Sequence, residues 1–535
     1  MSLILNGIFK DDMVFQRDRE IRVFGLASNE SGNKVVATIK DKRKNVAKAE
    51  TTEIYEDGFF LVTLPPLPKG GPYTLKVESK KDPEKIKISR VFIGEVWLAG
   101  GQSNMEYPLV RSEFAKAEIE RMPENNIHFY TVPVAGTYDE KQKEAEETSK
   151  WICVDRETCK NMSAVAYYFA MRVNEHLAGK EDDDIHIGII GCYLGGTSLA
   201  SWQSLESLEK TNEGIKYINE YLDEIENKSE EEYEKELSAY EAELDRYYSR
   251  AQVLFDENPY ATYKDIENRF GGAPWPPPVG KTSLRRPGAL FDTMVLRVAP
   301  YNLRGVIFYQ GEADVEEHYD DYGAVFKTLI EEWRESFLNR DLPFLFCQLP
   351  MYTSKDRKYM GYDDLKWPKL RRQQAKVAND VKDAYMTVLA DCGEFDNVHP
   401  SDKKTPGHRL ADLALRFVYD FKDIPAVSPY VVDIRRGEGV EITFGGDYNN
   451  LNLPTSLSSD DSGFEVAGED GRYYPAEASV DFDGRTVLLK CSKVEFPVKV
   501  RYAFFSYGMA NLVSDTGLAA SPFEVNIDNT IGDFY

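Results

Sequence analysis

Ser103 is the best candidate for a nucleophile in this sequence. It stands in the segment 100–105 (Gly-Gly-Gln-Ser-Asn-Met), directly after the apolar run 96–99. A serine that follows a parallel strand across two glycines lies on a tight turn at the carboxyl edge of the sheet, where ligands bind. The segment is not the G-x-S-x-G turn of the α/β-hydrolases, because Met105 replaces the last glycine. Taken alone, it also fits a strand-to-helix turn with a capping serine.

His399 is the best candidate for the base that such a serine needs. Histidine usually fills this role at neutral pH, and the chain has six histidines. His399 follows the apolar run 386–389 and lies three residues after Asp396. An Asp-x-x-His pair on one loop lets the carboxylate hold one ring nitrogen while the other nitrogen faces the serine. The alternative for His399 is a solvated loop histidine.

Two further strand ends carry groups that can stabilise an oxyanion. The run 185–190 is followed by Gly195 and Gly196, whose backbone N–H groups can approach a ligand closely. The run 305–308 is followed by Tyr-Gln-Gly-Glu, in which Gln310 offers an amide donor and Glu312 a carboxylate for a loop or a sugar hydroxyl. Each of these segments also fits a purely structural strand end.

The elements that must position these residues alternate in type along the chain. From about residue 91, short apolar runs alternate with segments of 3.6-residue periodicity at 163–178, 322–338 and 407–419. This alternation predicts an α/β domain with a parallel sheet, whose ligand crevice lies beyond the carboxyl ends of the strands. We expect a β-sandwich domain at 1–90, a catalytic domain at 91–425 and a second β-sandwich domain at 426–535.

A Glu-, Lys- and Tyr-rich segment, 205–285, interrupts the expected catalytic domain. Its apolar residues recur at helical spacing, which predicts one or two long amphipathic helices. A helical hairpin that packs on the sheet is the first interpretation. A lid, or a contact between copies in a homo-oligomer, is the alternative.

Composition and charge exclude several classes of protein. The formal charge of −25 and the pI of about 4.9 argue against nucleic-acid and anionic-membrane partners. No secretory signal or spanning segment is apparent, and the six cysteines include no C-x-x-C pair. We therefore expect a cytoplasmic globular protein with neither metal nor cofactor.

In order and spacing, these segments resemble the signature blocks of the SGNH hydrolases. More narrowly, they resemble the sialate O-acetylesterase and acetylxylan esterase group of carbohydrate esterases. The blocks of that group are Gly-Gln-Ser-Asn-Met, Gly-Gly-Thr, Tyr-Gln-Gly-Glu and Asp-x-x-His-Pro. They stand here at 101–105, 195–197, 309–312 and 396–400. The likeness extends to 13–17, 286–291 and 511–523, and it covers most of the chain outside the inserted segment.

The resemblance implies a flavodoxin-like SGNH domain of three layers and a Ser-His-Asp mechanism on acetyl esters of mono- or oligosaccharides. Ser103 would attack the acetyl carbonyl, His399 would move the proton, and Asp396 would orient the imidazole, a role that Glu312 could share. The expected oxyanion donors are the Ser103 amide, a Gly195 or Gly196 amide and the Gln310 side chain. The expected substrate contacts are Gln102, Asn104, Glu312 and Trp202.

Two other functions stay open on the sequence alone. One is a non-catalytic carbohydrate-binding protein on the same scaffold, whose aromatic platform would use Trp202, Trp275, Trp367 or Tyr362. The other is a lipase or thioesterase, which the polar residues around the expected site disfavour. The sugar itself is also open, because a sialic acid needs a nearby arginine whereas a neutral hemicellulose oligosaccharide does not. The candidate arginines are Arg111, Arg285, Arg286, Arg371 and Arg372.

Overall fold

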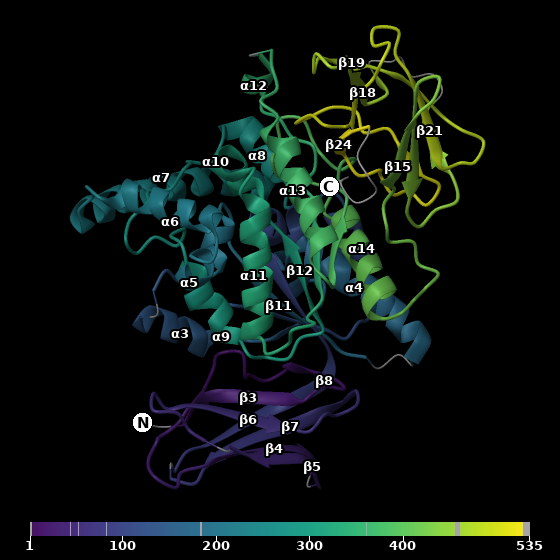
Figure 1. Ribbon diagram of the computed structural model, residues 1–535. Coiled ribbons are helices and arrows are strands. Elements are labelled where there is room, and N and C mark those ends of the chain that lie inside the picture. Colours follow the sequence, from purple (N-terminus) through teal and green to yellow (C-terminus); the bar gives the residue numbers. More distant parts are fainter. Residues whose placement is uncertain are drawn as a thin grey trace. The chain divides into compact units, whose positions relative to one another are not determined.

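The computed structural model describes residues 3–42, 44–51, 53–81, 83–137, 139–181, 185–359, 361–454 and 461–527. The chain divides into two compact units. Figure 1 labels the helices and strands of both. The first is built from Met1–Phe308 and Thr328–Phe344, and the second from Tyr309–Lys327 and Leu345–Tyr535. Ser103 and the two glycines lie in the first unit, whereas Gln310, Glu312, Asp396 and His399 lie in the second.

The first unit begins with antiparallel strands. A three-stranded sheet has the order β1 (Ile4–Leu5), β3 (Ile21–Leu26) and β6 (Phe59–Leu64). Other strands of the same part of the chain pair separately: β4 (Val35–Asp41) pairs with β5 (Lys44–Glu50) and with β7 (Gly70–Ser79). The expected strands in this part of the chain are therefore confirmed. Their classification as a separate sandwich domain stays a prediction.

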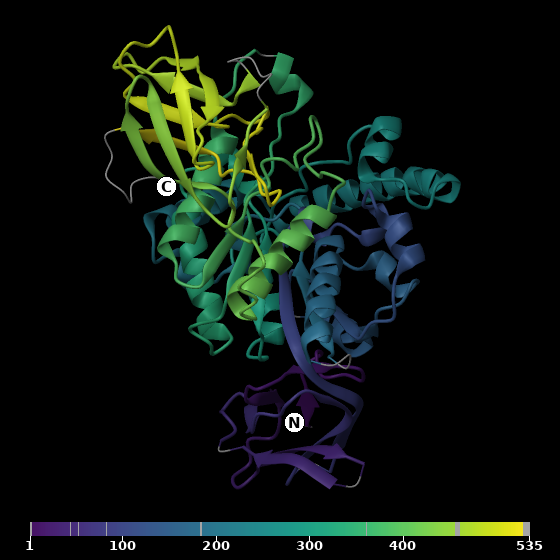
Figure 2. The ribbon, with the colours of Figure 1, turned by 90° about the vertical axis from the view of Figure 1, so that its right-hand side faces the viewer.

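A single long strand, β8 (Lys85–Gly101), connects these sheets to Ser103. Its first half pairs with β7 in antiparallel fashion, and its second half pairs in parallel with β2 (Val14–Gln16) and β11 (Ile187–Tyr193). Figure 2 shows it as one ribbon that rises from the N-terminal strands. Residues 91 and 93–101 are all buried, which is typical of a strand covered on both faces. The strand therefore delivers Ser103 from a rigid, well-packed element.

The parallel sheet that the sequence predicts is present. Strand β11 pairs in parallel with β8 on one side and with β9 (Ile127–Thr131) on the other, and β10 (Ile152–Cys153) adds an antiparallel edge strand. Helix α4 (Ala164–Glu181) packs on β9 and β11. Strand β12 (Gly305–Tyr309) carries Phe308, whose ring meets Trp333 of α11 (Tyr322–Ser336) edge-on at 5.9 Å.

The inserted segment is helical, as expected, although it contains four helices. They are α5 (Leu205–Leu208), α6 (Asn212–Ile225), α7 (Glu230–Glu257) and α8 (Tyr263–Phe270). Capping boxes start α7 at Ser229 and α8 at Thr262, since each side-chain oxygen accepts from the third helical N–H while the acidic residue there accepts in return. After Gly271 the chain runs without helix or strand until a π-helical turn at Phe291–Val295, which leads into α9 (Leu296–Val298).

The second unit joins further α/β elements to C-terminal sheets. Its helices and strands up to residue 418 are α10 (Val315–His318), β13 (Phe344–Cys347), α12 (Lys355–Tyr359), α13 (Lys366–Asp380), β14 (Ala384–Thr387) and α14 (Lys404–Leu413), which a π-helical turn continues to Val418. Strand β14 begins two residues earlier than the apolar run 386–389 indicates.

Three antiparallel sheets close the second unit. The first has the order β15 (Tyr430–Arg436), β16 (Val440–Gly445), β21 (Thr486–Lys490) and β20 (Glu477–Val480). The second has the order β19 (Tyr473–Pro475), β18 (Phe464–Ala467), β22 (Lys499–Tyr502) and β24 (Phe523–Asn526). The third pairs β17 (Leu451–Asn452) with β23 (Val513–Ser514). A shared core that includes Phe444, Phe464, Tyr502 and Phe523 holds them together.

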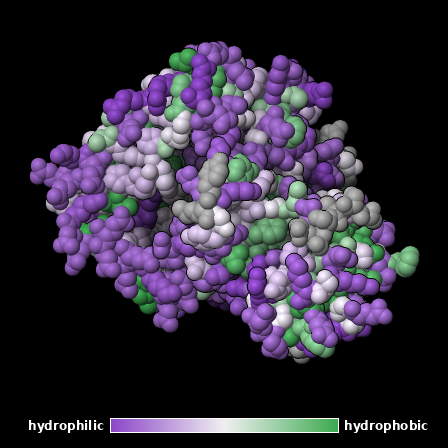
Figure 3. Space-filling view, turned by 90° about the horizontal axis from the view of Figure 1, so that it is seen from above, coloured by the Kyte–Doolittle hydropathy of each residue, from purple (hydrophilic) through white to green (hydrophobic). Residues whose placement is uncertain are grey.

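Hydrophilic residues cover much of the surface (Figure 3). Figure 3 shows a face on which hydrophilic residues dominate and hydrophobic residues form small groups. Among the residues that the structure describes, no helix combines the length and the apolar character needed to cross a bilayer.

Candidate active site

Ser103 lies on the strand-to-helix turn that the sequence predicts. Strand β8 ends at Gly101, whose φ of +131° suits glycine, and the short helix α1 (Ser103–Glu106) begins at the serine. The backbone carbonyl of Gln102 accepts the N–H groups of Met105 and Glu106, both at 2.9 Å. Ser103 itself is half-buried. The turn thus holds the serine at the carboxyl end of β8, where a nucleophile would act.

The Gly195–Gly196 loop lies beside Ser103 within the first unit. A Cβ atom placed on Gly195 would lie 3.3 Å from Ser103 Cβ. The Gly195 N–H donates to Glu106 Oε2 at 2.7 Å. Arg285 holds the loop from its carbonyl side, because Nε donates to Gly196 O and Nη2 to Gly195 O, each at 2.9 Å. Since the Gly195 amide is already engaged, Gly196 is the better of the two expected oxyanion donors.

The structure corrects the role expected for Trp202. Its indole is 0% exposed, so it cannot stack on a sugar. Nε1 donates to Thr197 Oγ1 at 2.9 Å, and that hydroxyl donates to Leu194 O at 2.7 Å. Trp202 therefore supports the glycine loop from inside the unit. Gln102 and Asn104 are also buried, and their contact with substrate stays a prediction.

His399 lies on a loop that is tied together by its own polar side chains. Its backbone N–H donates to Asn397 Oδ1 at 3.1 Å, and Asn397 Nδ2 donates to Glu394 Oε2 at 2.7 Å. The other Glu394 oxygen accepts the backbone N–H of Ser401 at 2.6 Å and its hydroxyl at 2.9 Å. Glu394 thus fixes the loop on both sides of the histidine.

The electrostatic surroundings keep the His399 imidazole neutral. Burial, and second the nearby charge of Lys403, lower its pKa from 6.5 to about 4. Burial also lowers the pKa of Lys403, to about 8, against the opposing charges of Glu312, Glu394 and Asp402. The Lys403 ammonium donates to Pro400 O, directly after the histidine. A histidine with this pKa can accept a proton across the neutral range.

Asp396 is engaged by α12 of the same unit. Its φ is +56°, and its backbone N–H donates to Thr353 O at 3.0 Å. Oδ1 accepts the Lys355 N–H at 2.9 Å, and Oδ2 forms an ion pair with Lys355 Nζ at 2.7 Å. An aspartate that orients His399 would therefore be shared with Lys355.

Gln310 is held in the interior of the second unit. Its Nε2 donates to Asp314 Oδ2, and its Oε1 accepts the Tyr322 hydroxyl at 3.1 Å. Because a carboxylate only accepts hydrogen bonds, this pair fixes the orientation of the amide. One of the two amide hydrogens is thus committed to Asp314. Glu312 is half-buried and lies close enough to Lys403 to oppose the fall in its pKa.

Sequence reasoning named Glu106 only as one of the polar residues around the expected site. It stands three residues after Ser103, which at the start of a helix places both on one face, so its spacing was a usable signal. Two further residues were missed. Glu394 and Lys403 bracket His399 in sequence, but no pattern of residue types marks them as its supports. In the described part of the chain, no group of three or more His, Cys, Asp or Glu residues could hold a metal ion.

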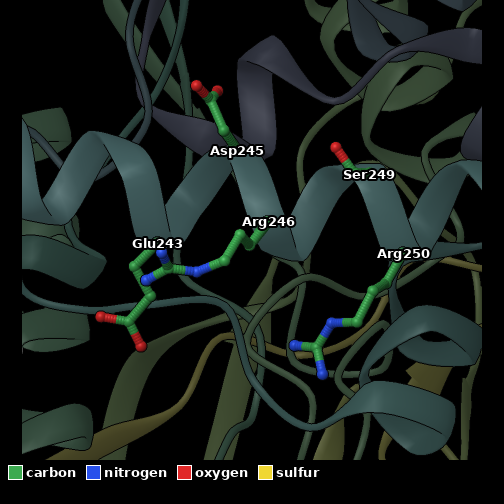
Figure 4. Close-up of a pocket in the computed structure, with 5 residues that line it drawn as sticks. All are labelled: Glu243, Asp245, Arg246, Ser249 and Arg250. Atoms are coloured by element: carbon green, nitrogen blue, oxygen red, sulfur yellow. The ribbon is translucent and has the colours of Figure 1, made fainter.

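A hollow on the inserted segment is separate from these residues. It is lined by residues of α7, namely Glu243, Asp245, Arg246, Ser249 and Arg250 (Figure 4). Figure 4 shows Asp245 and Ser249 pointing away from Arg250. The lining is charged and comes from a single helix, so we assign no chemistry to it.

Comparisons with known proteins bear on this geometry. Residues 276–416, which include Gln310, Asp396 and His399, match the family described as carbohydrate esterase, sialic acid-specific acetylesterase. Mouse sialate O-acetylesterase is 22% identical over 507 residues, covering 89% of this chain and 85% of the relative. The human enzyme is 23% identical over 441 residues, covering 78% and 72%.

A solved structure agrees in fold. The carbohydrate acetylesterase from Xanthomonas citri superposes with a TM-score of 0.72 at 23% identity, covering 98% of this chain and 99% of that one. The solved structure thus shows that the fold is shared. The family match and the curated relatives indicate that the protein is an ester hydrolase, and the relatives that it resembles in sequence are sialate O-acetylesterases.

Proposed function

We propose that the protein hydrolyses O-acetyl esters on sugars through an acetyl-enzyme formed on Ser103. The observation that carries this proposal is the turn between β8 and α1, which presents Ser103 beside the Gly195–Gly196 loop. A nucleophile at the end of β8 and backbone amides just after the neighbouring strand β11 are what acyl transfer needs.

In the proposed first step, Ser103 Oγ attacks the acetyl carbonyl carbon while the His399 imidazole takes the hydroxyl proton. The negative oxygen that forms is stabilised by the Ser103 and Gly196 amides, with the Gln310 side chain as a further donor. Each such donor contributes about 3 kcal/mol to the transition state. The tetrahedral intermediate collapses when the bond to the sugar oxygen breaks, and the imidazolium returns its proton to that oxygen.

In the second step, water attacks the acetyl group on Ser103, and His399 again takes the proton. Acetate leaves and Ser103 recovers its hydrogen. With a pKa of about 4, the ring is in the neutral form that a base requires at pH 7. Asp396 is the proposed orienting group, and its carboxylate also forms an ion pair with Lys355.

The finer fold assignment belongs to the same proposal. We infer a three-layer SGNH domain at 91–425, with the helical insertion, between β-sandwich domains at 1–90 and 426–535. The parallel pairing of β8, β11 and β9 supports the catalytic part of this division. The three antiparallel C-terminal sheets support its last part.

An acetate-release assay tests the proposed function. Wild-type protein is incubated with acetylated xylo-, manno- and gluco-oligosaccharides and with O-acetylated sialic acid, and acetate is measured enzymatically. Ser103→Ala should lower the rate at least about a thousandfold. The matched control is Ser249→Ala on α7, an exposed serine that is not part of the turn, and it should leave the rate unchanged. If the wild type releases no acetate from any of these sugars, the protein is not the proposed esterase.

A further inference from the structure

The inserted segment brings a tryptophan against the candidate oxyanion loop. A Cβ atom placed on Gly196 would lie 2.1 Å from Cη2 and 2.5 Å from Cζ3 of Trp275, so the indole packs directly on this glycine. Gly196 adjoins Gly195, which lies beside Ser103. Trp275 therefore reaches the neighbourhood of the nucleophile, although 172 residues separate the two in sequence (275 − 103).

The helices of the insertion hold the stretch that carries Trp275. The Tyr240 hydroxyl donates to Pro274 O at 3.3 Å, directly before the tryptophan. Farther along, the Tyr221 hydroxyl donates to Gly280 O at 3.2 Å, and Lys228 Nζ donates to Val279 O at 3.1 Å. Arg285 closes the stretch, with its guanidinium 5.5 Å from the Trp275 ring centre and bonded to both glycine carbonyls. The indole is thus fixed in place by α6, α7 and Arg285.

Trp275 nevertheless keeps 61% of its surface exposed. An indole that is anchored on one side and open on the other is suited to stack on a flat apolar surface. The C–H faces of a pyranose ring are such a surface, and sugar and drug-like ligands are typically bound by aromatic walls with a few polar groups. The exposed carboxylate of Glu106, bonded to Gly195, provides a polar group in the same place.

The charges of the first unit favour an uncharged sugar at this position. Burial raises the pKa of the Glu106 carboxyl, whereas its hydrogen bond from Gly195 and the nearby charge of Arg285 favour the carboxylate. The other two candidate arginines of this unit hold backbone carbonyls: Arg111 donates to Pro259 O and Ala261 O, both at 3.0 Å, and Arg286 donates to Gly136 O at 2.7 Å. A sialate carboxylate would meet the Glu106 carboxylate here, while Arg285, Arg111 and Arg286 already donate to backbone carbonyls.

We propose that Trp275 is the platform on which a neutral pyranose ring of an acetylated oligosaccharide stacks, which makes it a specificity-determining residue supplied by the insertion. This inference rests on the proposed esterase function and names its substrate class. It also assigns a role to the inserted helices, because they hold Trp275 beside the Gly195–Gly196 loop.

The test compares the kcat/KM for a neutral acetylated xylo-oligosaccharide with that for 4-nitrophenyl acetate, which has no sugar ring. In Trp275→Ala, the ratio of the two should fall at least about tenfold, equivalent to about 1.4 kcal/mol of lost binding in the transition state. Trp275→Phe should keep most of the ratio, because it retains an aromatic face. Phe482→Ala, which removes another fully exposed aromatic side chain, is the matched control and should leave the ratio unchanged. Thermal melting checks that each variant is folded.

The outcomes separate this inference from the proposed function. If the wild type releases acetate from neutral sugars but the ratio in Trp275→Ala equals that of the wild type, the platform is refuted while the esterase stands. The same holds if the wild type cleaves O-acetylated sialic acid at least as well as the neutral sugars. If the wild type releases acetate from none of the sugars, both proposals fall.

Discussion

The low pKa of His399 predicts that the enzyme keeps its activity in mild acid. The base in the proposed mechanism must be neutral, and the acid limb of kcat/KM reports the pKa of that base in the free enzyme. With a pKa of about 4, roughly nine tenths of the imidazole is neutral at pH 5. With the ordinary value of 6.5, only about 3% would be neutral. The two cases therefore differ about thirtyfold in kcat/KM at pH 5.

The assay is acetate release from an acetylated oligosaccharide between pH 3.5 and 8, with circular dichroism at each pH to exclude unfolding. We expect the acid limb near pH 4. In Lys403→Met the limb should move upward, because a positive charge is removed, but it should stay below 6.5, because burial is the larger cause. Lys404→Met, at the next position, is the matched control and should leave the limb in place. An acid limb near 6.5 in the wild type would refute the reasoning.

Three further predictions follow from named contacts. Asp396→Asn should lower kcat by less than Ser103→Ala does. A comparison with Glu312→Gln at saturating substrate shows which of the two carboxylates contributes more to orienting His399. A loss in Asp396→Asn as large as in Ser103→Ala would contradict the view that Asp396 and Glu312 share this role. Glu95 of β8 is 0% exposed and accepts hydrogen bonds from Arg17 Nε at 2.5 Å and Arg304 Nε at 2.6 Å. Glu95→Ala should therefore lower the free energy of unfolding, measured in urea, by about 3–5 kcal/mol. A change below about 1 kcal/mol would show that Glu95 and its two arginines do not anchor β8. Glu106→Gln keeps an acceptor for the Gly195 N–H but removes the negative charge. The ratio of kcat/KM for O-acetylated sialic acid to kcat/KM for a neutral acetylated sugar should therefore rise several-fold. An unchanged ratio would speak against charge as the reason for a preference for neutral sugars.

The low pKa of His399 also has a consequence for folding. The unfolded chain, with the ordinary histidine pKa, takes up a proton near pH 6.5, whereas the folded chain does so only near pH 4. Stability contributed by the neutral histidine is thus complete above pH 6.5 and is lost as the pH falls towards 4. Urea titrations at pH 7 and pH 5 measure this difference, which His399→Gln should reduce.

Local patterns in the sequence were sufficient to predict the elements that carry the candidate site. The stripe of Val325, Phe326, Leu329, Ile330 and Trp333 is buried along α11, because residues three or four apart share one face of a helix. The turn at Ser103 also follows from local chemistry, since glycine permits the φ of +131° at Gly101. Short-range rules therefore accounted for strand ends, helix faces and the place of the nucleophile.

Long-range contacts set the limits of that prediction. The contact of Trp275 with Gly196 joins an irregular stretch of the insertion to a loop 79 residues earlier (275 − 196), and no periodicity marks either end. The same limit explains the error over Trp202, whose burial depends on Thr197 and on the packing of Trp333, which donates to its backbone carbonyl at 2.8 Å. Which of two tryptophans meets a ligand is a property of the assembled unit, so the composition of each segment did not reveal it.

The most direct test of the central claim is detection of the acetyl group on Ser103. Wild-type protein is mixed with an acetylated oligosaccharide, quenched in acid within the first turnovers, digested and examined by mass spectrometry. We predict that the peptide containing Ser103 gains the mass of one acetyl group, that Ser103→Ala shows no such peptide, and that acetate release is lost with it. Sustained acetate release by Ser103→Ala, or an acetyl group found on another residue instead, would contradict the proposed mechanism.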